Sequence, residues 1–272
     1  MDRFSRLYVK SFPSFNKVEH RAVSGVGNHF RKAIILQNLA TKLRPNLNLD
    51  AMQLEEKGYS PNHNSYELSA VIEAAFTEVY SAIDCACKVV AAIHKNTTGV
   101  PQSSTRKLFH KIQSNRLDGV LHVALTDAFK NATWYKDLLR VRDELTHADT
   151  GSCHLDKATE KISYMHPGLG NSTQALVIED IFDRLESNLK NENLFLETVF
   201  RHLNTLLSAE PVFQMCGVFS GRCYTREVNP SEPIDFNSGM CTSYQWFDLE
   251  ANPSCPFSLV CGAYKRAKER ES

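Results

Sequence analysis

The stretch LLRVRDELTHADTG, residues 138–151, places two arginines and a histidine at the end of a segment with helical periodicity. Gly151 follows this segment and predicts the end of the helix. An arginine binds phosphate oxygens through its planar guanidinium, and a histidine takes up or releases a proton near neutral pH. The stretch is therefore suited to acid–base chemistry on a phosphate group.

Cleavage of RNA without a metal ion needs three chemical groups. A base takes the proton from the 2′-hydroxyl, an acid protonates the leaving 5′-oxygen, and a cation stabilises the charge that develops around phosphorus. His147 fits the two proton-transfer roles because the unperturbed pKa of histidine is about 6.5. Arg142 fits the third role because its guanidinium stays protonated and matches phosphate oxygens. One histidine does not readily fill both proton-transfer roles at once.

The segment Arg142-Asp-Glu-Leu-Thr-His147 resembles the signature of the HEPN superfamily (higher eukaryotes and prokaryotes nucleotide-binding domains), which is an arginine, four to six residues and a histidine. The resemblance covers this motif, its context VRDELTHAD and the long helices around it, at most residues 60–210. It implies a metal-independent endoribonuclease with RNA as its substrate and no cofactor. It also implies a homodimer in which both copies contribute Arg142 and His147 to one cleft. Family members commonly act as toxins or defence effectors, which implies an antitoxin or regulatory protein as a further partner.

Two arginines compete for the catalytic role. Residues five apart lie about 140° apart around a helix, whereas residues seven apart differ by only about 20°. Ideal geometry therefore places Arg140 on the face of His147, while the tightest spacing of the family signature favours Arg142. We expect Arg142 and His147 to be catalytic, Arg140 to be a supporting phosphate contact, and Asp143 to orient His147.

A structural explanation of the same stretch stays open. Arg140 with Glu144 and Asp143 with His147 have the spacing of helix-surface pairs, and basic groups near a helix C-terminus interact favourably with its dipole. The alternative function is then a catalytically inactive helical module that binds a protein partner or a nucleotide. Asp84, at the edge of an apolar stripe, either lines the same cleft or is a solvated helix carboxylate.

The apolar periodicity predicts mainly helices up to about residue 210. Long helices are expected from about residue 64 to 95, from about 118 to 147, and from about 173 to the break at Pro211, with shorter ones at 24–43, 49–57 and 104–114. The expected fold class is mainly α, an up-and-down helical bundle of the HEPN type with a small irregular appendage. Its expected buried residues are Leu68, Ile72, Phe76, Val79, Leu125, Phe129 and Leu145.

Composition divides the chain into three expected ranges. Residues 1–60 form an N-terminal helical extension, residues 61–210 form the bundle, and residues 211–272 form the small Cys-rich appendage. Within the bundle, residues 150–172 are rich in turn formers and include the strand-like KISYM, which predicts a lid or hairpin beside the helix end.

The eight cysteines and the balanced charge restrict the partners and the location of the chain. Five cysteines crowd into the last 57 residues, but no Cys-x2-Cys pair is present, so we expect reduced thiols and no metal. Lys and Arg equal Asp and Glu at 31 each, so RNA must be met by a local basic site. With no apolar signal segment and no run of about 18 apolar residues, we expect a cytoplasmic protein without a membrane partner.

Overall fold

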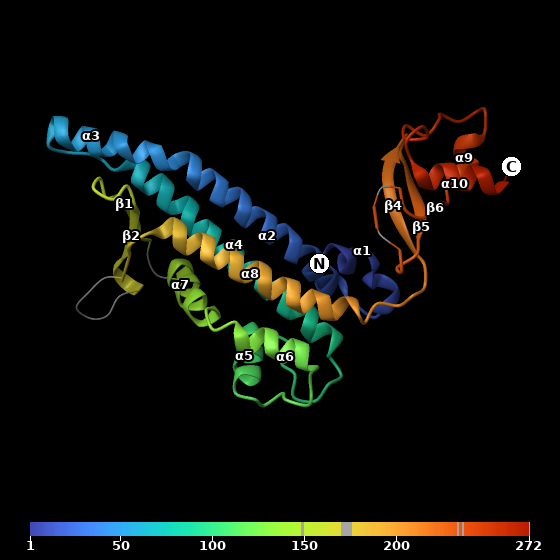
Figure 1. The fold of residues 1–272 in the computed structure, drawn as a ribbon, viewed down its shortest axis with the longest axis horizontal. Helices are drawn as coiled ribbons and strands as arrows, with labels where there is room; N and C mark the ends of the chain where they lie inside the picture. The colour runs from blue at the N-terminus through green and yellow to red at the C-terminus, as the bar shows by residue number, and fades with distance from the viewer. Residues whose placement is uncertain (148–149, 170–175, 233, 236, 272) are drawn as a thin grey trace. The chain divides into compact units, whose positions relative to one another are not determined.

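The computed structural model describes residues 1–147, 150–169, 176–232, 234–235 and 237–271, and for His147, Leu176 and Glu271 the backbone alone. The chain divides into two compact units, which Figure 1 draws with their helices and strands. Unit 1 combines Met1–Phe15 with Phe200–Ser272, and unit 2 is Asn16–Val199. This division joins the two ends of the chain and differs from the three consecutive ranges expected from composition.

Two long antiparallel helices, α2 (Lys17–Leu43) and α4 (His63–Ile93), form the centre of unit 2. Asn16 starts α2, because its side chain accepts hydrogen bonds from the backbone of Val18 and Glu19 and the Glu19 carboxylate accepts one from the Asn16 backbone. The short helices η1 (Arg44–Asn46) and α3 (Leu47–Lys57) connect the pair.

Charged residues link the two long helices. The Glu78 carboxylate of α4 pairs with His29 and Lys32 of α2, each at 2.6 Å. Burial by itself would raise the pKa of Glu78, but the hydrogen bonds and the charges of His29 and Lys32 together outweigh burial and lower it. The ionised Glu78 carboxylate therefore fixes the register of α2 along α4 through these two pairs.

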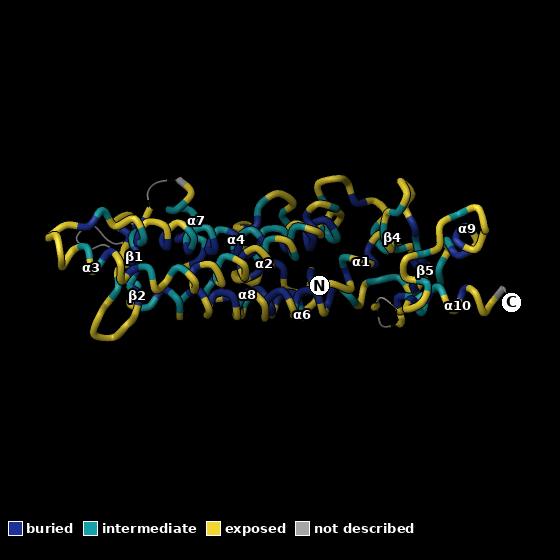
Figure 2. The backbone as a smooth tube through the Cα atoms, turned by 90° about the horizontal axis from the view of Figure 1, so that it is seen from above, coloured by how far each residue is buried: buried dark blue, intermediate teal, exposed yellow. Residues whose placement is uncertain are grey.

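The core of unit 2 confirms the apolar stripe of α4, whose buried positions are visible in Figure 2. Six of the seven residues expected in the core are buried, whereas Leu145 keeps part of its surface exposed. The buried six are Leu68, Ile72, Phe76, Val79, Leu125 and Phe129.

The prediction of one continuous helix over residues 118–147 is wrong, because the structure has two helices there. Helix α6 (Val123–Asn131) ends before Ala132, and α7 (Tyr135–His147) begins three residues later. The break lets the rings of Phe129 and Tyr135 both pack on Phe109 of α5 (Thr105–Gln113), with ring centres 4.6 and 3.6 Å away. Aromatic packing therefore outweighs continuity of the helix.

A three-stranded antiparallel sheet follows α7. Strand β1 (Ser152–Leu155) pairs with β2 (Ile162–His166), β2 pairs with β3 (Leu176–Ile178), and the 3-10 turn η2 (Pro167–Leu169) follows β2. The strand-like KISYM thus corresponds to β2. Because β3 takes residues that were expected to be helical, α8 (Ile181–Asn204) begins later than residue 173, with the Asp180 side chain capping its first turn.

Unit 1 is built on a second three-stranded antiparallel sheet. Its strands are β4 (Val212–Phe219), β5 (Arg222–Val228) and β6 (Met240–Cys241), and the helices of this unit are α1 (Asp2–Ser11), α9 (Tyr244–Asp248) and α10 (Gly262–Glu271). The Phe4 ring of α1 is fully buried and packs edge-on against Phe200 at the end of α8.

The two sheets overturn the expected fold class of a mainly α up-and-down bundle with an irregular appendage. The fold is mixed, with helices and two antiparallel sheets, because segments without helical periodicity pair as strands with the next strand along the chain. Among the described helices, none combines the length and hydrophobicity that crossing a lipid bilayer requires.

Candidate functional site

Arg142 packs against an aromatic ring of α4 and pairs with the carboxylate of its neighbour on α7. Its guanidinium carbon lies 4.8 Å from the centre of the Tyr80 ring, and its Nη1 donates to the Asp143 Oδ1 at 3.1 Å. The side chain is 29% exposed, and its buried Nε has no hydrogen-bond partner among the described residues. The cation is therefore oriented by the protein yet still reachable from solvent.

Asp143 receives a second guanidinium from a different helix. Its Oδ2 pairs with Arg106 in the first turn of α5, while its Oδ1 pairs with Arg142. The Asp143 side chain is 33% exposed and that of Arg106 is 63% exposed. One carboxylate thus connects two positively charged side chains whose positions in the sequence are 36 residues apart, as their numbers 106 and 142 show.

Asp84 positions the start of α5 beside this cluster. Its Oδ1 accepts a hydrogen bond from the Thr105 hydroxyl at 2.6 Å, and its Oδ2 pairs with Lys88 at 2.7 Å. Burial raises the pKa of Tyr80, and the nearby charges of Asp84 and Asp143 raise it further, while the charge of Arg142 acts in the opposite direction. Asp84 therefore fixes the residue that precedes Arg106.

Glu73 of α4 ties the segment after α7 to the same helix. Its Oε1 accepts hydrogen bonds from the Gly151 backbone at 2.7 Å and from the Tyr164 hydroxyl at 2.6 Å. The Glu144 carboxylate also abuts Gly168 in η2, so closely that a methyl group there would clash with it. The first sheet therefore lies beside α7, as expected for a hairpin next to the helix end.

The four residues expected at the site have different surroundings in the structure. Arg142 and Asp143 lie together, whereas Arg140 is exposed to solvent and has no ion pair among the described residues. The backbone of His147 ends α7, but its side chain lies outside the described residues. The expected contact of Asp143 with His147 therefore stays a prediction, and the described partners of Asp143 are arginines.

Sequence reasoning missed Tyr80 and Arg106. A signal for Arg106 was present, because it stands in the first turn of a helix, where the dipole disfavours a cation. Such a placement indicates an acidic partner elsewhere in the fold, but the identity of Asp143 as that partner required the tertiary structure. Tyr80 carried no comparable signal, since aromatic residues are ordinary members of helix stripes.

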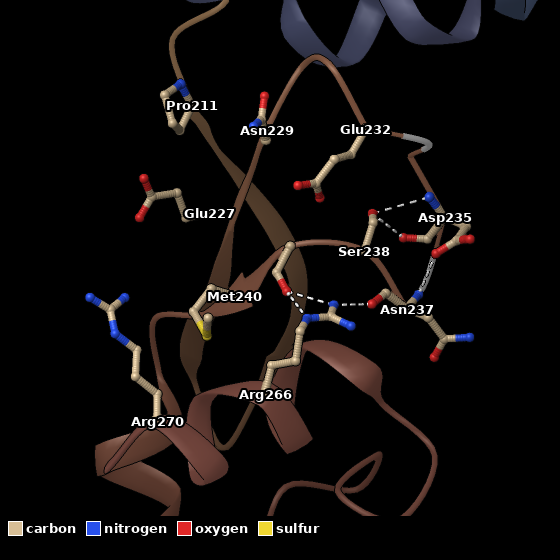
Figure 3. A pocket seen from close by; sticks show the side chains of 11 residues that line it. Pro211, Glu227, Asn229, Glu232, Asp235, Asn237, Ser238, Met240, Arg266 and Arg270 are labelled. Atoms are coloured by element: carbon tan, nitrogen blue, oxygen red, sulfur yellow. Dashed lines mark hydrogen bonds between the residues drawn. The ribbon is translucent and has the colours of Figure 1, made fainter.

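A hollow of about 630 Å³ in unit 1 is a second candidate, and Figure 3 shows its side chains. Three carboxylates line it, from Glu227, Glu232 and Asp235, together with two arginines. The guanidinium of Arg266 donates to the Gly239 carbonyl at 2.6 and 3.0 Å, so the backbone already binds it. The surplus of carboxylates makes this hollow unsuitable for a phosphate group.

Four cysteines of unit 1 line a smaller cavity of about 110 Å³, namely Cys216, Cys241, Cys255 and Cys261. All eight cysteines of the chain are free thiols, and burial raises the pKa of both Cys216 and Cys241. Across the part of the chain that the structure describes, no three His, Cys, Asp or Glu side chains are placed to share a metal ion. We therefore assign no function to this cavity.

Comparisons with protein-family models, with curated proteins and with solved structures gave no significant match. The candidate site consequently rests on its residues and their geometry.

Proposed function

We propose that the chain is a metal-independent endoribonuclease of the HEPN type. It cleaves RNA in the cytoplasm through attack of the 2′-hydroxyl on the neighbouring phosphate. The observation that carries the proposal is the orientation of Arg142. Its half-buried guanidinium is held by Tyr80 and Asp143, and Arg142 lies on the helix that ends at His147. A cation held in a fixed position is what this reaction needs at phosphorus, because it stabilises the charge that develops there.

In the proposed mechanism, two copies of the chain bring their α7 ends together. The His147 imidazole of one copy takes the 2′-hydroxyl proton, and the imidazolium of the other protonates the leaving 5′-oxygen. Arg142 stabilises the negative charge on the phosphorane-like transition state. The products carry a 2′,3′-cyclic phosphate and a 5′-hydroxyl. A toxin or defence effector restrained by an antitoxin or regulatory protein would fit this activity.

The test is cleavage of a single-stranded RNA in the presence of EDTA. His147→Ala should reduce the rate by about 10²- to 10⁴-fold, the usual contribution of general acid–base catalysis. Arg142→Ala should also lose rate, and Arg142→Lys should restore it only in part, because an ammonium cannot make the bidentate phosphate contact. His110→Ala, which removes an exposed histidine of α5, is the matched control and should retain full activity.

Light scattering on the same samples should show a dimer for both the wild type and His147→Ala. Wild-type cleavage by His147→Ala, or cleavage abolished by EDTA, would remove His147 from the mechanism. The inactive helical module would then be the better account of the chain. A loss of rate in Arg140→Ala, with full activity retained by Arg142→Ala, would transfer the catalytic role to the other arginine.

A further inference from the structure

The carboxylate of Asp143 occupies a position between two guanidinium groups. Arg142 binds one of its oxygens at 3.1 Å and Arg106 binds the other. The two arginines come from different helices, so their approach to one group depends on the packing of α5 and α7 against α4. Each guanidinium thus has its own oxygen of the same small anion.

A phosphodiester offers the same pattern of acceptors as this carboxylate. Both groups present two equivalent anionic oxygens, and arginine binds either one through its planar set of donors. A single carboxylate also leaves the two guanidinium groups with a net positive charge. The first turn of α5 adds to this potential, because Arg106 lies where backbone N–H groups point out of the helix.

The two arginines differ in how firmly they are held. Arg142 is stacked on Tyr80, whereas Arg106 is 63% exposed and Asp143 is the one ion-pair partner that the structure gives it among the described residues. The Thr105 hydroxyl, bonded to Asp84, fixes the backbone from which Arg106 projects. When an incoming anion replaces Asp143, Tyr80 therefore still holds Arg142 and Asp84 still holds the start of α5.

We propose that Arg106 and Arg142 together bind one phosphodiester of a single-stranded RNA, and that Asp143 is an internal stand-in which this phosphate displaces. The inference rests on the proposed function insofar as the phosphodiester belongs to RNA. Arg106 is then a second phosphate-binding residue, supplied by α5. Asp143 lowers RNA affinity, because its contacts with both arginines must be broken before the phosphate binds.

The first experiment measures binding of a fluorescein-labelled single-stranded RNA in EDTA, in the His147→Ala background to prevent cleavage. Arg106→Ala should weaken binding about tenfold and reduce the slope of log K against log salt by about 0.7, the loss of one phosphate contact. Arg116→Ala removes an exposed arginine just after α5 and should change the affinity less than twofold. Equal effects of the two substitutions would overturn the proposal.

The second experiment tests whether the Asp143 carboxylate competes with the RNA phosphate for the two arginines. Asp143→Asn removes the competing charge and keeps the size of the side chain, so the RNA should bind several-fold more tightly than to the parent. If Asp143 served only to position the arginines, Asp143→Asn would weaken binding. That weakening would overturn the role of the carboxylate.

A third measurement separates this inference from the proposed function. Pyrophosphate should raise the thermal midpoint of the wild type and of Arg116→Ala more than that of Arg106→Ala. If these Arg106-dependent effects appear while RNA is not cleaved, the arginine pair stands and the ribonuclease proposal fails. If RNA is cleaved equally well by wild type and Arg106→Ala, the ribonuclease proposal stands and the arginine pair fails.

Discussion

Arg142 and Arg140 show how two similar residues acquire different environments within one helix turn. They lie about 200° apart around α7, so only one of them can face α4. The contact with Tyr80 places Arg142 on that face and leaves Arg140 in solvent. The helix period therefore separates the two arginines, and the packing of α7 decides that Arg142 is the one that faces α4.

Glu192 is a second residue whose environment determines its chemistry. It is fully buried in α8, and neither carboxylate oxygen has a hydrogen-bond partner among the described residues. Burial raises the pKa of Glu192 well above its ordinary value, because a buried charge would be poorly solvated. The folded protein therefore holds this carboxyl in its protonated form over a wider pH range than the unfolded chain does.

This shift predicts a pH-dependent effect of Glu192→Gln. As the pH rises above the pKa of the unfolded carboxyl, about 4.3, the unfolded chain releases a proton that the folded protein retains, so Glu192 lowers stability progressively. Glu192→Gln removes this dependence, and its thermal midpoint relative to wild type should be higher at pH 8 than at pH 5. Glu186→Gln, at an exposed position of α8, is the control. A difference from wild type that is constant across pH would contradict the prediction.

At the scale of elements, the close approach of α2 and α4 depends on a glycine. A methyl group added to Gly25 would lie 2.7 Å from the Cys85 Sγ of the facing helix. Glycine in a helix interior normally costs about 1 kcal/mol relative to alanine, so its presence here has a packing reason. The two longest helices can therefore meet closely at this point.

Gly25→Ala should destabilise the protein, because a clash of this kind costs about 1–3 kcal/mol and exceeds the gain in helix propensity. In a Cys85→Ala background the sulfur is absent, and the same substitution should become stabilising. Urea unfolding of the four proteins in this cycle measures the coupling. Equal effects of Gly25→Ala in both backgrounds would show that Cys85 is not what limits the space.

At the scale of the whole molecule, the two ends of the chain belong to one unit. Residues Met1–Phe15 join Phe200–Ser272, so unit 2 is inserted between two parts of unit 1. Phe4 is the clearest link, since it is fully buried and packs against Phe200 with ring centres 5.5 Å apart. The N-terminal segment is therefore part of the core of unit 1.

Phe4→Ala should destabilise unit 1 by about 3–5 kcal/mol, the usual cost of removing a buried phenylalanine. Hydrogen exchange followed by mass spectrometry should show faster exchange in residues 200–228 and unchanged exchange in α2 and α4. Val9→Ala, at an exposed position of the same helix, is the control. Faster exchange spread evenly over both units would contradict the division of the chain.

The sequence by itself determined those features that depend only on residues close to one another along the chain. The apolar stripe of α4, the strand at KISYM and the end of α7 at His147 all follow from the pattern of nearby residues. Residues a few positions apart are held at fixed angles by the backbone itself. Their arrangement therefore needs no information from distant parts of the chain.

The tertiary structure alone decided those features that depend on contacts between different elements. The break between α6 and α7 follows from stacking on Phe109, and β3 exists because it pairs with β2. The meeting of Arg106 with Asp143 joins side chains 37 positions apart. Such contacts are set by the packing of several elements at once, and no spacing in the sequence encodes them. The end of the site helix at His147 was therefore predictable, whereas its start at Tyr135 and the contact of Arg142 with Tyr80 were not.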